Sequence, residues 1–96
     1  MSRRILFKFR LYVADDAQNG ALAKANLNAF CRLYLAGQHE IEVVDVLKEP
    51  KRALSDSIFM TPTLVKLSPS PVLRIVGTLS HTAVVLQALG LEAVLV

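Results

Sequence analysis

Residues 55–67 read SDSIFMTPTLVKL, and the step through Pro62 decides the fold. A proline pushes the residue before it, here Thr61, out of the helical region of backbone space and into an extended one. A strand tolerates proline at its first residue, which can spare its N–H group. The apolar run that follows therefore predicts a strand that begins after Pro62 and ends near Leu67.

Toward the N-terminus, residues 5–14 alternate in character with the period of two that is typical of a strand. One face of this strand is polar at Lys8 and Arg10, so we expect that face either to be exposed or to meet a partner. The other face is apolar and is formed by Ile5, Phe7, Phe9, Leu11 and Val13.

Helical spacing follows this strand as far as Ala36. Asp15 and Asp16 are candidate N-caps, and Gly37 is a natural stop signal. The predicted buried face is a stripe at helical spacing, formed by Leu22, Ala25, Ala29, Leu33 and Ala36 and widened by Leu27, Phe30 and Tyr34.

Residues 41–46 predict a second strand, and β-branched side chains on both of its faces are typical of an interior parallel strand. The two strands and the helix between them then form a right-handed βαβ unit. Pro50 suits the first turn of a short helix that reaches Asp56.

The prolines of residues 68–71 predict a turn, after which residues 72–76 form a fourth strand, antiparallel to the third. Ser80 is a candidate cap for a last helix over residues 81–89, and Gly90 would end that helix. The predicted order is βαβαββα, an α/β class, in one domain over residues 1–96.

The last third of the chain suits a strand nearly as well as a helix, because residues 83–86 and 93–96 are rich in β-branched side chains. Local preference leaves both structures open. The apolar surface of residues 84–91 and 94–96 exceeds what one small core needs, which predicts a homodimer or a homotetramer.

Composition narrows the class of protein. Of the 96 residues 53% are hydrophobic, the net charge is +3 and there is one cysteine, Cys31. A single cysteine excludes an internal disulfide, and the apolar runs are too short or too interrupted to span a bilayer. Lys8 and Arg10 break the first apolar run, so no signal peptide is expected. These features predict a cytoplasmic protein that contacts no membrane and weakly favours acidic partners.

The order βαβαββα with a proline at the entry to the third strand resembles the thioredoxin-like fold. In that fold this proline follows a cis peptide bond and faces a redox dithiol. The resemblance therefore implies a cis bond before Pro62, with an ordinary trans proline as the alternative. One cysteine excludes two-thiol chemistry.

Three segments resemble the KaiB family of the cyanobacterial circadian clock. They are residues 9–14 (FRLYVA), 41–50 (IEVVDVLKEP) and 58–77 (IFMTPTLVKLSPSPVLRIVG). The resemblance implies a non-enzymatic regulator without a cofactor, which binds the hexameric RecA-type ATPase KaiC and modulates its phosphorylation state. A KaiA-like protein or a histidine kinase is a further implied partner.

The same resemblance implies two folds: a thioredoxin-like form that binds the ATPase ring, and a resting KaiB fold, often a tetramer, that differs in the C-terminal half. Gly77-Thr78-Leu79-Ser80 lacks the acidic residue that the family carries there. A KaiB-like stress-response or kinase-sensor module without a clock role is therefore the alternative function.

Arg10, Lys48 and Arg74 match basic positions of the KaiB segments, and we expect them to contact the partner. Their alternative role is to keep the protein soluble. Against an acidic surface they should mostly tune the association rate and its salt dependence.

Other chemistry has weaker support. His39 and His81 lack metal-ligand spacing, so no metal is expected. A thioredoxin- or glutathione-transferase-type enzyme needs a reactive thiol or hydroxyl at the start of the first helix, whereas Cys31 lies well inside it and is expected to be buried. Nucleic-acid binding is disfavoured because the basic residues lack interleaved stacking aromatics; those residues are Arg3, Arg4, Lys8 and Arg10.

Overall fold

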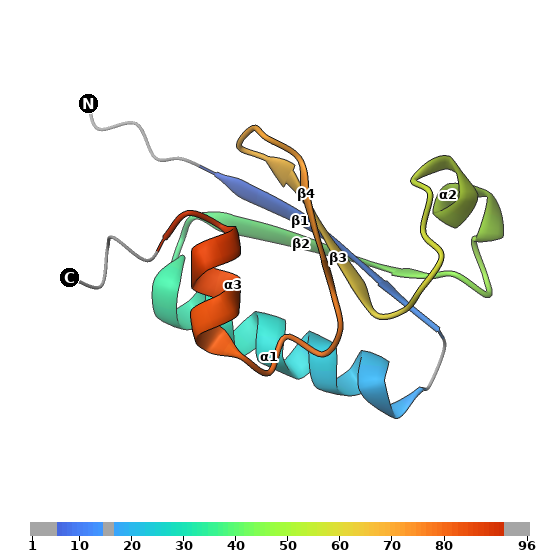
Figure 1. The fold of residues 1–96 in the computed structure, drawn as a ribbon, viewed down its shortest axis with the longest axis horizontal. Coiled ribbons are helices and arrows are strands. Elements are labelled where there is room, and N and C mark those ends of the chain that lie inside the picture. Colours follow the sequence, from blue (N-terminus) through green and yellow to red (C-terminus); the bar gives the residue numbers. More distant parts are fainter. Residues whose placement is uncertain (1–5, 15–16, 92–96) are drawn as a thin grey trace.

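The computed structural model describes residues 6–14 and 17–91 and confirms the predicted order βαβαββα (Figure 1). The elements are β1 (Phe7–Val13), α1 (Gln18–Tyr34), β2 (His39–Asp45), α2 (Pro50–Ser55), β3 (Thr63–Ser68), β4 (Leu73–Val76) and α3 (Thr82–Ala88). None of the helices among the described residues is long and apolar enough to cross a bilayer.

The sheet has the order β2-β1-β3-β4, with β1 parallel to β2 and antiparallel to β3. β4 is antiparallel to β3, as predicted. The prediction of an interior position for the second strand is wrong, because β2 lies at an edge of the sheet and 44% of Val43 is exposed. β-Branched residues suit edge and interior strands alike, so this signal could not separate the two.

Apolar side chains pack on both faces of the sheet. α1 and α3 lie along one face and α2 lies beyond the other (Figure 1). Alternate residues of β1 divide between these faces, since Phe9 and Leu11 join the cluster under α1 and α3, whereas Tyr12 joins Ala53 of α2. The period of two in β1 therefore gives the sheet a core on each side.

The predicted buried stripe of α1 is wrong in phase. Leu22 and Leu33 are exposed, by 45% and 72%. The residues predicted to widen that stripe are correct, since Leu27 and Phe30 are buried and Tyr34 packs against the core, and the helix also buries Gly20, Ala23 and Cys31. Several members of the predicted stripe were alanines, whose small side chains do little to fix which face of a helix turns inward.

The helix ends differ in part from expectation. Ala17 occupies the N-cap position of α1 and makes no side-chain cap, and the predicted caps Asp15 and Asp16 lie outside the described residues. Pro50 stands in the first turn of α2, as predicted.

The cap predicted for the last helix is wrong. His81 is the N-cap residue of α3 and makes no side-chain cap hydrogen bond. The Ser80 hydroxyl lies 2.7 Å from that of Thr78 and 3.4 Å from Asn26 Nδ2, which also donates to the Thr78 carbonyl at 2.8 Å. Ser80 therefore helps fasten the β4–α3 connection to α1 instead of starting the helix.

Candidate partner-binding site

One row of residues crosses all four strands. Arg10 of β1 lies opposite Glu42 of β2 and Val65 of β3, and Val65 lies opposite Arg74 of β4. Residues that face each other on neighbouring strands project to the same side of a sheet. Val65 packs with Ala53 of α2, so this side is the one that α2 covers. The fold thus places two of the three predicted contact residues, Arg10 and Arg74, on one face with a single strand between them.

Two carboxylates from different elements hold Arg10. Its Nε donates to Glu42 Oε1 at 2.9 Å and its Nη1 donates to Asp56 Oδ2 at 3.0 Å. The hydrogen bond to Glu42 raises the pKa of Arg10 more than burial lowers it. Glu42 also accepts from Arg52 Nη2 of α2 at 2.8 Å, and hydrogen bonds from Arg10 and then Arg52 lower the pKa of Glu42. Glu42 therefore links β1, β2 and α2.

Beneath this network lies Tyr12, which has no exposed surface. Its hydroxyl donates to Asp56 Oδ2, the oxygen that also accepts from Arg10. Burial raises the pKa of Tyr12, and Asp56 raises it further. The hydroxyl of Tyr12, and then Arg10, lower the pKa of Asp56. Arg10, Tyr12 and Asp56 together fasten the end of α2 to the sheet.

Arg74 has a freer guanidinium than Arg10. Its Nη1 donates to the Ser57 carbonyl at 3.0 Å, and none of the ion pairs found among residues 6–14 and 17–91 includes it. It lies near enough to Asp56 to add to the lowering of that pKa. The side chain is exposed, so most of its N–H groups remain available to a partner.

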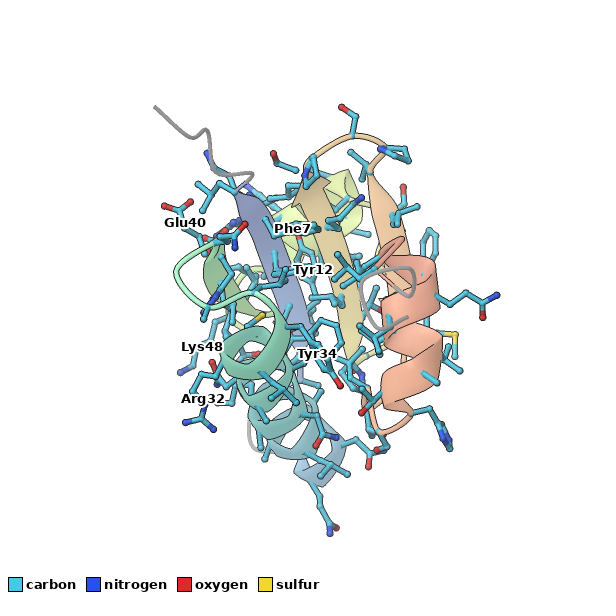
Figure 2. The ribbon with its side chains drawn as sticks, turned by 90° about the vertical axis from the view of Figure 1, so that its left-hand side faces the viewer. Phe7, Tyr12, Arg32, Tyr34, Glu40 and Lys48 are labelled. Atoms are coloured by element: carbon cyan, nitrogen blue, oxygen red, sulfur yellow. The ribbon has the colours of Figure 1, made fainter. Side chains whose placement is uncertain are left out.

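Lys48 lies in the turn after β2, where its N–H donates to the Asp45 carbonyl at 3.1 Å. Its side chain is exposed and joins no ion pair within the described part of the chain (Figure 2). The structure therefore does not tie Lys48 to the Arg10 network. The side chain of Asp45 has a local role, since its Oδ1 accepts from the Leu47 N–H at 2.9 Å.

Pro62 is buried at the entry to β3, and the Thr61–Pro62 peptide bond is cis. A hollow beside it is lined by Thr61 and by residues from the end of β1 and the start of α1, which are Ala14, Ala17, Gln18, Asn19 and Gly20. None of these lining residues carries a thiol. Within the described residues, the hollow beside Pro62 is therefore lined by small, hydroxyl and amide side chains.

Large apolar side chains are exposed close to Arg74. Phe59 is 84% exposed and Met60 is 63% exposed, and both line a shallow hollow with Arg74 and Val76. An aromatic ring, a methionine and an arginine are the residue types enriched at protein–protein interfaces. This hollow lies at the side of the sheet that carries Arg74.

The remaining candidates do not form a chemical site. Cys31 has no exposed surface, and burial raises its pKa to about 11, whereas its neighbour Arg32 projects outward (Figure 2). His39 Nδ1 lies 2.8 Å from the Leu35 carbonyl and His81 is exposed. The described residues contain no group of three or more side chains that could hold a metal ion.

Sequence reasoning missed the partners of Arg10. Glu42 lies in a run predicted to be a strand, Asp56 lies at the end of a predicted short helix, and Tyr12 lies on a strand face predicted either to be exposed or to meet a partner. A residue pair separated by 46 positions, such as Arg10 and Asp56, leaves no local pattern in one sequence. The exposure of Phe59 and Met60 was also not predicted, because apolar residues before a strand usually enter the core.

Known proteins resemble this chain closely in sequence. Residues 10–91 match the model of the KaiB domain family. The circadian clock protein KaiB3 of Synechocystis is 40% identical over 94 residues, which cover 98% of this chain and 87% of that protein. The circadian clock oscillator protein KaiB of Synechococcus elongatus is 41% identical over 91 residues, or 95% of this chain and 89% of that protein.

Solved structures confirm the predicted thioredoxin-like fold. Chloroplastic thioredoxin z superposes with a TM-score of 0.76 at 20% identity, over 94% of this chain and 81% of that one. The N-terminal domain of Synechococcus elongatus SasA gives a TM-score of 0.74 at 18% identity, over 96% of this chain and 90% of that one. At such identities the likeness concerns the fold.

Proposed function

The chain belongs to the KaiB family, and we propose that it is a regulatory protein that binds a KaiC-like hexameric RecA-type ATPase and modulates its phosphorylation state without catalysis of its own. The observation that carries this proposal is the family match over residues 10–91, which includes all three predicted contact residues. They are Arg10, Lys48 and Arg74.

The surface around Arg74 supports docking. Phe59 and Met60 expose apolar side chains. Their burial against a partner would contribute favourably to the free energy of binding. Arg74 beside them and Lys48 in the turn after β2 supply positive charge, which speeds encounter with an acidic ring surface. Arg10 acts differently, because two carboxylates already engage it. Its part in docking is to hold α2 and the loop after it in place.

The hollow beside Pro62 supports binding over redox catalysis. The described residues of its lining carry no sulfur, and Cys31 lies elsewhere, buried, with a raised pKa that keeps it a thiol at neutral pH. A thioredoxin-type exchange needs an accessible thiolate. The scaffold therefore retains the shape of an oxidoreductase and lacks its reactive group.

The resting state of the proposed regulator is a dimer or tetramer in which the C-terminal half takes a second arrangement. Residues 83–86, whose sequence suits a strand as well as a helix, lie in α3 in the described form. Of the segments predicted to self-associate, Val84 is 57% exposed, whereas Val85, Leu86 and Leu89 are buried in the core and residues 94–96 lie outside the described residues. Val72 and Val76 are also more than half exposed, and self-association would remove the apolar area of these valines from water. Light scattering at high concentration tests this part, and a strictly monomeric mass would contradict it.

Binding is tested by mixing the purified protein with a KaiC hexamer in ATP or in ADP and following co-elution on size exclusion over hours. We expect a complex that forms slowly if refolding precedes binding. Lys48→Glu should slow association, and the effect should fade in high salt. Lys24→Glu is the matched control, because Lys24 is an exposed lysine on α1, beyond the opposite face of the sheet. Failure to co-elute at every time and in both nucleotides would refute the proposal.

A further inference from the structure

β4 lies at an edge of the sheet, with β3 on one side and no strand of the described chain on the other. Its register fixes which of its backbone groups are unpaired. The Gly77 N–H donates to the Pro62 carbonyl at 2.9 Å, directly beyond the Thr63–Val76 pair. Hydrogen-bonded pairs alternate with non-bonded pairs in an antiparallel ladder. The N–H and C=O groups of Arg74 and Val76 therefore point away from β3, toward the open edge.

The side chains along this edge form a simple pattern. Arg74 lies opposite Val65 and Val76 lies opposite Thr63, so both stand on the face that α2 covers, and Val72 lies directly before β4, two residues from Arg74. Val72 is 59% exposed, Val76 is 55% exposed and Arg74 is exposed as well. The pattern is thus an exposed cation between two exposed apolar residues, on β4 and directly before it, and the outer backbone groups of Arg74 and Val76 have no partner among the described residues.

We propose that the β4 edge accepts a fifth strand from a partner protein, namely an extended antiparallel segment with an acidic residue opposite Arg74 and an apolar residue two positions to either side. In that register the acidic residue exchanges both main-chain hydrogen bonds with Arg74, and its carboxylate lies beside the guanidinium. The flanking apolar residues face Val72 and Val76. Strand addition of this kind takes its affinity from the main chain and its specificity from alternate side chains.

The charged side chains at the two edges of the sheet indicate which edge an acidic segment would join and which kind of partner would supply it. A second copy of this chain paired through all three positions would place Arg74 against the partner's Arg74, and like charges directly opposite each other are destabilising. The other edge of the sheet, β2, carries Glu40 and Glu42, which would repel an acidic segment. An acidic segment therefore fits β4 better than β2, and a different protein fits it better than a second copy.

This inference goes beyond the binding of an ATPase proposed above, because it needs no ATPase and is tested with a peptide. The probe is acetyl-Thr-Val-Thr-Glu-Thr-Val-Thr-amide, titrated into the isotope-labelled full chain at millimolar concentration and followed by amide NMR. We expect the amide signals of Arg74 and Val76 to move and those of β2 to stay. Replacing the peptide's glutamate by lysine should weaken binding by about tenfold, from loss of the charge pair and gain of a like charge.

Two matched comparisons separate strand addition from loose charge attraction. N-methylation of the peptide's glutamate removes the N–H that faces Arg74 and should weaken binding by about tenfold. N-methylation of the threonine that follows alters an N–H on the far side and should change binding by no more than about threefold. Arg74→Glu, whose fold is verified by its unchanged core amide signals, should instead prefer the lysine peptide.

Three outcomes would overturn the inference: no shift at Arg74 and Val76, equal effects of the two N-methylations, or shifts centred on β2. Arg74 would then be a charge that keeps the edge from aggregating. Because the assay contains no ATPase, any of these results would leave the proposed regulatory function standing.

Discussion

Arg10 Nε lies 2.9 Å from Glu42 Oε1, and the two residues stand directly opposite each other on the parallel strands β1 and β2. The same arginine reaches Asp56, just after α2, and Asp56 also accepts the Tyr12 hydroxyl. A single cation thus connects two strands and a helix end. The stability of the α2 face should depend on this network more than on any other polar contact in the described structure.

Glu42→Gln removes the carboxylate that Arg10 and Arg52 share. Because 48% of the Glu42 side chain is exposed, solvent screens the interaction, and we expect a loss of about 0.5–1 kcal/mol in the free energy of unfolding. Urea unfolding measures this loss of stability. The loss should be smaller in 1 M salt, where the screening length between charges is about 3 Å. Glu40→Gln is the control, since Glu40 lies on the same strand opposite Lys8 without an ion pair in the described structure. Equal losses in the two variants would contradict the network.

Tyr12→Phe keeps the buried ring and removes the hydroxyl that donates to Asp56. The expected cost is about 1–2 kcal/mol, because a hydrogen bond to a charged acceptor is lost in a mostly buried place. Tyr34→Phe is the matched control: the Tyr34 ring packs against Phe30 with centroids 4.9 Å apart, and its hydroxyl has no partner within the described residues. Denaturant midpoints compare the two, and a Tyr12→Phe variant as stable as the parent would show that the hydroxyl contributes nothing.

Asp56 makes stability depend on acid pH. Its pKa in the folded protein lies below the ordinary aspartate value of about 3.9, first because of Tyr12 and then because of Arg10. A lowered folded pKa contributes stability that is complete above the unfolded pKa and is lost as pH falls through the folded pKa. We therefore expect the melting temperature to decrease as the pH is lowered below about 4. Asp56→Asn should flatten this fall, though not abolish it, since the pKa of Glu42 is also lowered. A slope unchanged in Asp56→Asn would exclude Asp56 as a source.

The features that could be predicted from the sequence are those that residues close together in the chain determine. The strand of residues 7–13 and its core face were predictable because alternation is local and strong. The start of α2 at Pro50 and the turn at residues 68–71 were predictable because proline restricts the backbone wherever it stands. These signals determine the order of elements, and with it the fold.

Properties that depend on neighbours distant in the sequence were not predictable. Whether β2 lies inside the sheet or at its edge depends on which strands flank β1, and the phase of α1 depends on how the helix sits on Phe9 and Leu11. The candidate site shows the same limit. Arg10 and Arg74 could be selected as basic residues, whereas the carboxylates that occupy Arg10 and leave Arg74 freer come from other elements.

Cys31 should be chemically silent in the folded protein. It has no exposed surface, and burial raises its pKa to about 11, so both access and thiolate formation oppose reaction. A disulfide reagent at pH 8 should label the native protein at least about a hundredfold more slowly than the protein in urea, because labelling must wait for opening. A short peptide that contains cysteine, labelled in both solvents, corrects for the effect of urea on the reagent. Rapid labelling of the native chain would mean that α1 leaves the sheet often enough to expose the Cys31 thiol. The folded protein could then take part in thiol exchange.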